Sequence, residues 1–330
     1  MVAQRLLGGR YRLQKRLEDG GMGSVWHGWD ERLRRNVAVK ILHPSLAHDE
    51  VCRHRFRSEA RAMAAMRHRG IAGIFDYGEE TDAEGRYVSY LIMELVRGRP
   101  LSDLLTERGR LDATTVVAIV ADTAAALNVA HRAGIIHRDV KPSNILVDEK
   151  TNTPKIIDFG IARSGAGMGL TSTGMVMGTA SYVSPEQLRG GDPSASSDVY
   201  SLGVVAYECL AGRRPFHDDN TWRVIEGHLN TPPPPLPEDV PAAVAETVMR
   251  ALAKTPQDRW SDAAELATAC RELLDPRAAA ESARREHDRP NRSAAPGDPG
   301  APVPPQSRHV GQRRRPSTLI PFRRVAIAGE

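Results

Sequence analysis

The sequence predicts an α+β fold with two lobes, a small lobe built on an antiparallel sheet with one helix and a larger, mainly helical lobe. Up to about residue 95, short alternating segments are interrupted by glycine and aspartate, which is typical of strands and tight turns. From about residue 96 to 275, apolar residues recur at helical spacing. We therefore expect one domain over 11–275, preceded by an extension over 1–10 and followed by a tail over 276–330.

The small lobe is expected to contain four strands and one helix. The helix is predicted over 51–68, where Val51, Phe56, Ala60, Met63 and Met66 recur roughly one turn apart. The four strand segments are Tyr11–Leu13, Val25–Trp29, Asn36–Lys40 and Tyr87–Met93.

Capping residues mark the helices of the larger lobe. Asp112 is a good N-cap for an apolar run that ends near Ala130, and Gly134 follows as a C-terminal glycine. The segment 197–211 is apolar nearly all round and precedes Gly212, so we expect a buried central helix. Residues 231–235 read as a loop, and helical spacing returns over 240–274.

The tail over 276–330 differs from the rest in composition. It holds 11 Arg against 5 acidic residues, a net charge of +6, which leaves −2 of the chain's +4 for residues 1–275. Proline, arginine and alanine dominate and aromatic residues almost vanish, so we expect disorder. The positive charge of the tail would suit binding to nucleic acid or to an anionic membrane. Because the tail has almost no aromatic side chains to stack on bases, we favour a solvated linker or docking arm.

The cysteines and the apolar runs of the sequence indicate the cellular compartment. The three cysteines are far apart and form no CxxC or zinc pattern, which favours reduced thiols in a reducing compartment. No apolar signal-peptide core and no uncharged apolar run of membrane-spanning length is present. We therefore expect a cytoplasmic protein without a membrane span.

Three short strings carry the chemistry. They are Val37-Ala38-Val39-Lys40, then His137-Arg138-Asp139 with Lys141 and Asn144, and finally Asp158-Phe159-Gly160, which begins 14 residues after Asn144. Their order and spacing provide two carboxylates, an amide and an ammonium group for a nucleoside triphosphate and its metal ions. Charge neutralisation and in-line positioning are the main requirements of phosphoryl transfer.

With these strings, residues 11–275 resemble a eukaryotic-like bacterial serine/threonine protein kinase. The resemblance implies that Asp139 orients the acceptor hydroxyl and that Lys141 contacts the γ-phosphate. It implies that Asn144 and Asp158 hold Mg²⁺, with Mn²⁺ as the alternative metal. It also implies that Lys40 grips the ATP phosphates and is held by Glu59 of the predicted helix. Glu50 is the other acid in reach, but the pattern places it before the helix begins.

The resemblance also assigns the nucleotide pocket. The backbone of Glu94 and Val96 would meet adenine with Met93 behind it, and Val25, Ala38 and Leu146 would sandwich the ring, although such residues are often simple core. The phosphates would lie under Leu17, Gly20, Gly21, Met22, Gly23 and Ser24. The chain departs from the family at Glu18, which stands where the first glycine of this loop belongs. We therefore expect weakened affinity for ATP.

The remaining implications concern acceptor and regulation. Lys141 together with 178–186 resembles the branch that phosphorylates Ser and Thr, with Thr179 bridging Asp139 and Lys141. Glu186 and Arg259 match a buried ion pair of the family. The glycine-rich loop between Gly160 and Gly178 carries Thr171 and Thr173, which we expect to be autophosphorylated and received by Arg138 and Arg163. A merely flexible polar loop is the alternative.

The expected function is thus an ATP-dependent, non-specific serine/threonine protein kinase that acts on protein substrates. A pseudokinase, which would bind nucleotide and signal as a scaffold, is suggested only by Glu18. A nucleic-acid binder is suggested only by the tail, so no nucleic-acid partner is expected. The sequence does not decide whether the domain forms a homodimer for autophosphorylation in trans.

Overall fold

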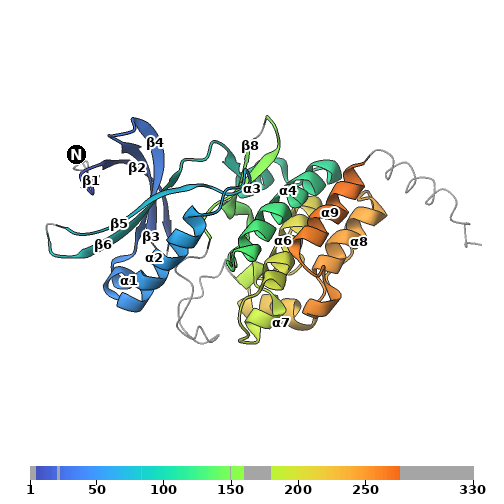
Figure 1. The fold of residues 1–330 in the computed structure, drawn as a ribbon. Coiled ribbons are helices and arrows are strands. Elements are labelled where there is room, and N and C mark those ends of the chain that lie inside the picture. The colour runs from blue at the N-terminus through green and yellow to red at the C-terminus, as the bar shows by residue number, and fades with distance from the viewer. Residues whose placement is uncertain (1–4, 21–22, 83, 149, 160–179, 276–330) are drawn as a thin grey trace, which may run out of the picture. The chain divides into compact units, whose positions relative to one another are not determined.

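A computed structural model of the chain describes residues 5–20, 23–82, 84–148, 150–159 and 180–275. It confirms the predicted α+β architecture, with a sheet half followed by a mainly helical half (Figure 1). The loop with Thr171 and Thr173 and the tail over 276–330 lie outside the described residues, so the expectations for them stay predictions.

The first half contains a six-stranded antiparallel sheet with the strand order β1-β2-β3-β4-β6-β5. Four of its strands include the predicted segments, whereas β1 and β5 escape the sequence pattern because β1 is two residues long and β5 carries three acids and a glycine. The strands are β1 (Leu6–Leu7), β2 (Tyr11–Gly20), β3 (Gly23–Asp30), β4 (Arg35–Leu42), β5 (Ile74–Thr81) and β6 (Tyr87–Glu94).

Two helices, α1 (Pro44–His48) and α2 (Glu50–Ala64), follow β4. Asp49 caps α2 by accepting hydrogen bonds from the N–H groups of Val51 and Cys52, so the helix begins one residue earlier than predicted. The expectation that Glu50 precedes the helix is therefore wrong. The helix also ends at Ala64 instead of His68.

The sheet has two apolar faces that belong to different cores. One face packs Val37, Val39 and Ile92 into a small separate cluster. The other face contributes Ala38, Leu42 and Met93 to the large core, which also includes Phe56 of α2 and continues into the helical half. Alternating residues of β4 thus divide between the two cores, as strand geometry requires.

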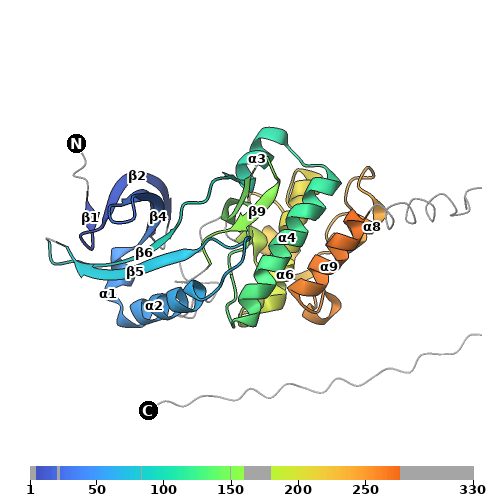
Figure 2. The same cartoon turned by 45° about the horizontal axis from the view of Figure 1, so that its top comes forward.

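The second half is built around four packed helices, α4, α6, α8 and α9 (Figure 2). Nearly every residue of α6 is buried, which confirms the predicted central helix. Its helices are α3 (Leu101–Arg108), α4 (Ala113–Arg132), α5 (Pro185–Leu188), α6 (Ala195–Ala211), α7 (Thr221–Asn230), α8 (Ala242–Ala251) and α9 (Ala263–Leu274). A small sheet combines β7 (Arg99–Pro100), which precedes α3, with β8 (Ile145–Asp148) and β9 (Thr153–Ile156), which follow α4.

The caps of these helices follow the sequence closely. Asp112 caps α4 by accepting from the N–H of Thr115. Gly134 and Gly212 adopt positive φ angles of 76° and 72° just after α4 and α6, where a side chain would be strained. By length and composition alone α4 could cross a membrane, and 56% of its most apolar window is buried within the fold.

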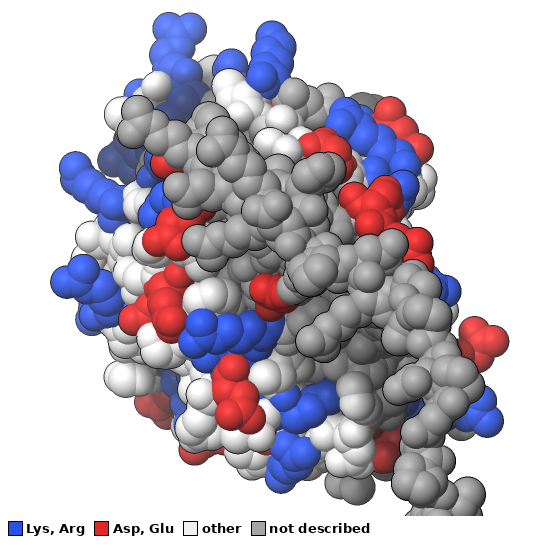
Figure 3. All heavy atoms as spheres, turned by 90° about the vertical axis from the view of Figure 1, so that its right-hand side faces the viewer, with Lys and Arg blue, Asp and Glu red and all other residues white. Residues whose placement is uncertain are grey.

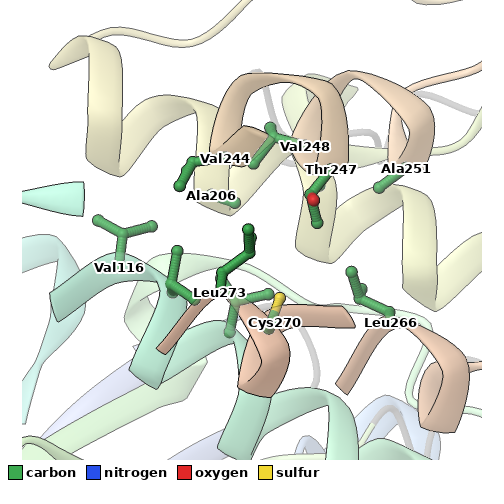
Figure 4. A pocket seen from close by; sticks show the side chains of 12 residues that line it. Val116, Ala206, Val244, Thr247, Val248, Ala251, Leu266, Cys270 and Leu273 are labelled. Atoms are coloured by element: carbon green, nitrogen blue, oxygen red, sulfur yellow. The ribbon is translucent and has the colours of Figure 1, made fainter. Parts of the chain in front are cut away.

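A small apolar cavity lies between α4, α6, α8 and α9 (Figure 4). Its free space is about 10 Å³, which is room for about one water molecule. The hydroxyl of Thr247 at its wall is already used, because it donates to the carbonyl of Ala243. The cavity is therefore a packing gap of the helical core.

One buried ion pair ties the segment before α6 to the segment before α9. The guanidinium of Arg259 is 1% exposed and contacts both carboxylate oxygens of Glu186, at 2.9 and 2.7 Å. Arg259 also donates to the carbonyls of Ala253, Ser196 and Lys254. Burial alone would raise the pKa of Glu186, but the hydrogen bonds from Arg259 and Ser197 outweigh it and lower the pKa to about 2.

We expect Glu186→Gln to lower the free energy of unfolding at pH 7 by roughly 3 kcal/mol, because it leaves the Arg259 charge buried and unpaired. Since the pKa of Glu186 is below its ordinary value, this stabilisation is complete above about pH 4.5 and is lost as the pH falls towards 2. Urea unfolding at pH 7 and pH 3 measures both effects. Glu107→Gln, which removes an exposed pair with Arg99, is the control and should cost less than about 1 kcal/mol. Equal losses for the two variants would contradict the role of the buried pair.

Candidate active site

The loop between α4 and β8 is held by one buried carboxylate, that of Asp198 in the first turn of α6. Its two oxygens accept hydrogen bonds from the backbone N–H groups of His137 and Arg138, at 2.8 and 2.9 Å. One oxygen also lies 2.8 Å from Nε2 of His131. Arg138 has a φ of 66°, which is uncommon for a residue other than glycine. Asp198 thus fixes the backbone just before Asp139.

His137 connects this loop with the segment that precedes Phe159. Its Nδ1 accepts from the backbone N–H of Asp139 at 3.2 Å, and its Nε2 donates to the carbonyl of Ile157 at 3.1 Å. Burial lowers the pKa of His137, so the ring is neutral and each nitrogen has the protonation that its partner needs. The ring centroid lies 4.6 Å from that of Phe159. A single side chain therefore sets the register of Asp139 against Asp158.

Asp139, Lys141 and Asn144 form a compact polar cluster. The Lys141 ammonium lies 2.9 Å from the Asp139 carboxylate. The amide nitrogen of Asn144 donates to the backbone carbonyl of Asp139 at 2.8 Å and to its carboxylate at 3.1 Å. These bonds fix the Asn144 amide and leave its oxygen, a hard donor, as a possible ligand for a metal ion.

The structure brings Lys40 of β4 to Asp158, 118 residues along the chain, as an ion pair and hydrogen bond. The Lys40 residue is 3% exposed, so its ammonium is directed into the interior between the two halves. Asp158 has a φ of 58°. Together with Asn144 it supplies one amide and one carboxylate oxygen, a donor set that suits a divalent cation which keeps water and phosphate ligands.

The predicted Lys40–Glu59 ion pair does not form in this structure. Lys40 pairs with Asp158, and Glu59 of α2 instead lies 3.7 Å from the guanidinium of Arg138. Helical spacing correctly places Glu59 on the side of α2 that faces the site. It cannot set the distance between α2 and β4, which depends on how the helix sits against the sheet.

The packing of the β2–β3 hairpin against β4 requires a glycine at position 23. Gly23 has a φ of 147°, and a Cβ there would lie 1.9 Å from the carbonyl oxygen of Ile41 in β4. Only glycine fits this close approach. A Cβ at Gly20, which pairs with Gly23, would lie 3.8 Å from the Gly23 carbonyl oxygen, an ordinary van der Waals contact among the described residues. Gly21 and Met22 lie outside the described residues.

The structure shows the surroundings of two further residues of the predicted phosphate loop, Ser24 and Leu17. The Ser24 hydroxyl accepts from the indole N–H of Trp26 at 2.8 Å, which occupies one of its lone pairs. Leu17 is the extra residue of a β-bulge, between the pairs Arg16–Trp26 and Glu18–Val25, and is 51% exposed.

The connection after β6 lies beside the β8–β9 hairpin. Glu94 pairs with Lys155 of β9 at 2.6 Å and accepts from the N–H of Gly73 at 3.1 Å. A pocket of about 420 Å³ adjoins this connection. Its lining comprises Glu94, Leu95, Val96, Arg97, Leu146, Asp148, Thr151, Thr153 and Lys155.

Three of the predicted ring-contact positions belong to or pack against the large core, and the fourth lines a pocket. Ala38 and Met93 are opposite each other in the β4–β6 ladder, and Val25 packs against the same large cluster. Leu146 of β8 is half-buried at the rim of the 420 Å³ pocket. The structure is thus compatible with these positions around an adenine ring, although no described contact distinguishes them from core.

Asp198 is the residue that sequence reasoning missed, and a signal for it exists. Asp198 lies in the first turn of a mostly apolar helix, and a buried carboxylate requires hydrogen-bond donors. Thr171, Thr173, Thr179 and Arg163 lie outside the described residues, so their predicted roles are not tested.

Comparison with known sequences gives one consistent result. The protein kinase domain family matches residues 11–273. The serine/threonine-protein kinase PknA of Mycobacterium tuberculosis is 47% identical over 292 residues, which is 88% of this chain and 65% of PknA. PknL of the same species is 41% identical over 261 residues, or 78% of this chain and 64% of PknL. The matched part of the chain therefore spans slightly less than two thirds of the length of these relatives.

The fold has solved counterparts. The crystal structure of a point mutant of the M. tuberculosis PknI kinase domain matches with a TM-score of 0.63 and 27% identity, and covers 83% of this chain and 100% of that one. A double mutant of the same domain gives a TM-score of 0.64 at the same identity and coverage.

We expect Asp198→Asn to loosen the loop that contains Asp139, because an amide NH₂ would face N–H donors that now share a carboxylate. Hydrogen exchange at the amides of His137 and Arg138 should accelerate, and the free energy of unfolding should fall by about 2 kcal/mol. Asp122→Asn, at a surface pair with Arg69, is the matched control. Unchanged exchange in Asp198→Asn would show that the loop does not depend on this carboxylate.

Proposed function

The chain belongs to the protein kinase family, and we propose that it transfers the γ-phosphate of ATP to Ser and Thr hydroxyls of proteins. The observation that carries this proposal is the convergence of Asp139, Lys141 and Asn144 with the Lys40–Asp158 pair, from three distant segments. The names of the most similar relatives support the Ser/Thr acceptor class.

Each side chain has a definite task in this proposal. Asp139, oriented by Asn144, accepts a hydrogen bond from the acceptor hydroxyl and aligns it for attack. Lys141, beside Asp139, offsets negative charge on the transferred group, and Lys40 binds the phosphates nearer the nucleoside. Asn144 and Asp158 would hold the divalent cation that the family uses with ATP, and we propose Mg²⁺, with Mn²⁺ as the alternative. The cation, when bound, neutralises charge on the phosphate oxygens.

The catalytic set argues against the pseudokinase alternative. Lys40, Asp139, Asn144 and Asp158 are all present, and the structure positions them with a shared network around His137 and Asp198. A scaffold that only binds nucleotide would not require the Asp139–Asn144 contact.

On the face drawn in Figure 3, the described residues do not gather basic side chains into one patch. Figure 3 views the molecule from the right-hand side of Figure 1, and its basic and acidic side chains are interspersed around the grey residues. A nucleic-acid interface usually gathers basic residues on one face. We accordingly propose protein substrates and a cytoplasmic site of action, where ATP is available.

We expect Asp139→Asn to reduce ³²P transfer from labelled ATP to a Ser/Thr protein substrate by about 10²–10⁴-fold, because the hydroxyl loses its acceptor. Nucleotide binding should be retained, since Lys40 and Asp158 are unchanged. Asp103→Asn, at an exposed position of α3, controls for the loss of one charge. Equal labelling by wild type and Asp139→Asn would refute catalysis at this site.

We also propose activation by autophosphorylation at Thr171 and Thr173, with Arg138 as one receiver of the phosphate. A phosphoryl group adds close to two negative charges, which an arginine can bind. A homodimer would allow this phosphoryl transfer to occur in trans, from one copy of the chain to the other.

Mass spectrometry of active protein is therefore expected to find phosphate on Thr171 and Thr173, and Thr171→Ala/Thr173→Ala should lower activity without changing nucleotide affinity. Active protein with both residues unmodified would contradict this proposal. Asp139→Asn serves as the control, since it should carry no phosphate at either position.

A further inference from the structure

Glu18, which replaces a glycine of the phosphate-binding loop, has a defined position on the sheet. In the antiparallel ladders Glu18 lies opposite Val25, and Val25 lies opposite Lys40. Directly opposed residues of antiparallel strands project from the same face. Glu18, Val25 and Lys40 therefore form one cross-strand row.

The packing identifies which face this is. Val25 packs against the large core that contains Ala38 and Met93, on the face from which Lys40 reaches Asp158. The opposite face carries Val39 and Trp26 in the separate cluster. The row thus faces the site, and with strands about 4.8 Å apart the backbones of Glu18 and Lys40 are about 10 Å from each other.

The adjacent acid, Asp19, provides a contrast. Asp19 is opposite Ser24, one step along the strand, and therefore projects from the other face. Its carboxylate forms an ion pair with Arg16 at 2.6 Å, and Arg16 in turn lies over the Trp26 ring. The described residues include no such basic partner for Glu18, which is exposed at the mouth of the site.

The electrostatic consequence depends on what enters the site. Lys40 and Lys141 are already paired with Asp158 and Asp139, so Glu18 adds an uncompensated negative charge. A metal-free nucleoside triphosphate is a polyanion, and a bound divalent cation cancels part of its charge. The repulsion from Glu18 is therefore larger for the metal-free form.

We propose that Glu18 is a specificity-determining residue that makes this site selective for the cation-bound nucleoside triphosphate over the metal-free polyanion. This inference rests on the proposed function, because it requires the triphosphate to lie beneath the β2–β3 hairpin near Lys40. It differs from a uniform loss of affinity, since the two charge states of the nucleotide respond unequally.

The test compares the dissociation constants of a non-hydrolysable ATP analogue, measured by calorimetry with Mg²⁺ and with EDTA. Glu18→Gln keeps the shape of the side chain and removes its charge. It should tighten metal-free binding by about 3- to 10-fold and metal-loaded binding by less than about twofold. The difference should shrink as NaCl is raised, because the groups are exposed to solvent.

Asp19→Asn is the matched control, because it removes one charge from the adjacent residue on the opposite face. It should leave the ratio of the two dissociation constants within about twofold of wild type. An unchanged ratio in Glu18→Gln, or equal changes in the two variants, would overturn the inference. If no variant and no wild type binds the analogue even with Mg²⁺, the proposed function itself fails.

Discussion

The carboxylate of Asp198 is the contact on which the arrangement of the site depends. It is 1% exposed, and an acid so deeply buried is tolerable only where donors surround it. Those donors are two successive backbone N–H groups of the loop that carries Asp139, together with the ring of His131. The central helix α6 therefore does more than fill the core, because its first turn sets the backbone of the loop and holds Arg138 at a positive φ.

His137, next to the loop residues that Asp198 holds, positions the rest of the site. Its neutral imidazole is hydrogen-bonded both to the backbone N–H of Asp139 and to the carbonyl of the residue before Asp158. Asp158 in turn forms an ion pair with Lys40 of the sheet half. Arg138 connects the same loop with Glu59 of α2. The two halves are thus joined by charged contacts at the site and by the large apolar core that runs through both, whereas the smaller cluster lies within the sheet half alone.

The sequence predicted the fold class, the start of α4 and the central helix α6 with its terminal glycine, because periodicity, Asp112 and Gly212 are local signals with local causes. It also identified which polar residues converge, since their types and spacing suit phosphoryl transfer. The features that it missed depend on long-range packing. The edge strands β1 and β5 are defined by the strands they pair with. The partner of Glu59 depends on the distance between α2 and β4, and the role of Asp198 depends on a loop 60 residues away.

Gly20 and Gly23 of the β2–β3 hairpin differ in a way that is useful experimentally. A Cβ at Gly23 would collide with the backbone of β4, whereas a Cβ at Gly20 would make only an ordinary contact among the described residues. Two of the three cysteines are buried and only Cys52 is partly accessible. A chain with Cys52 replaced could therefore carry a single fluorophore at position 20, two residues along β2 from Glu18. Such an optical reporter would follow movement of the hairpin in solution without disturbing either core.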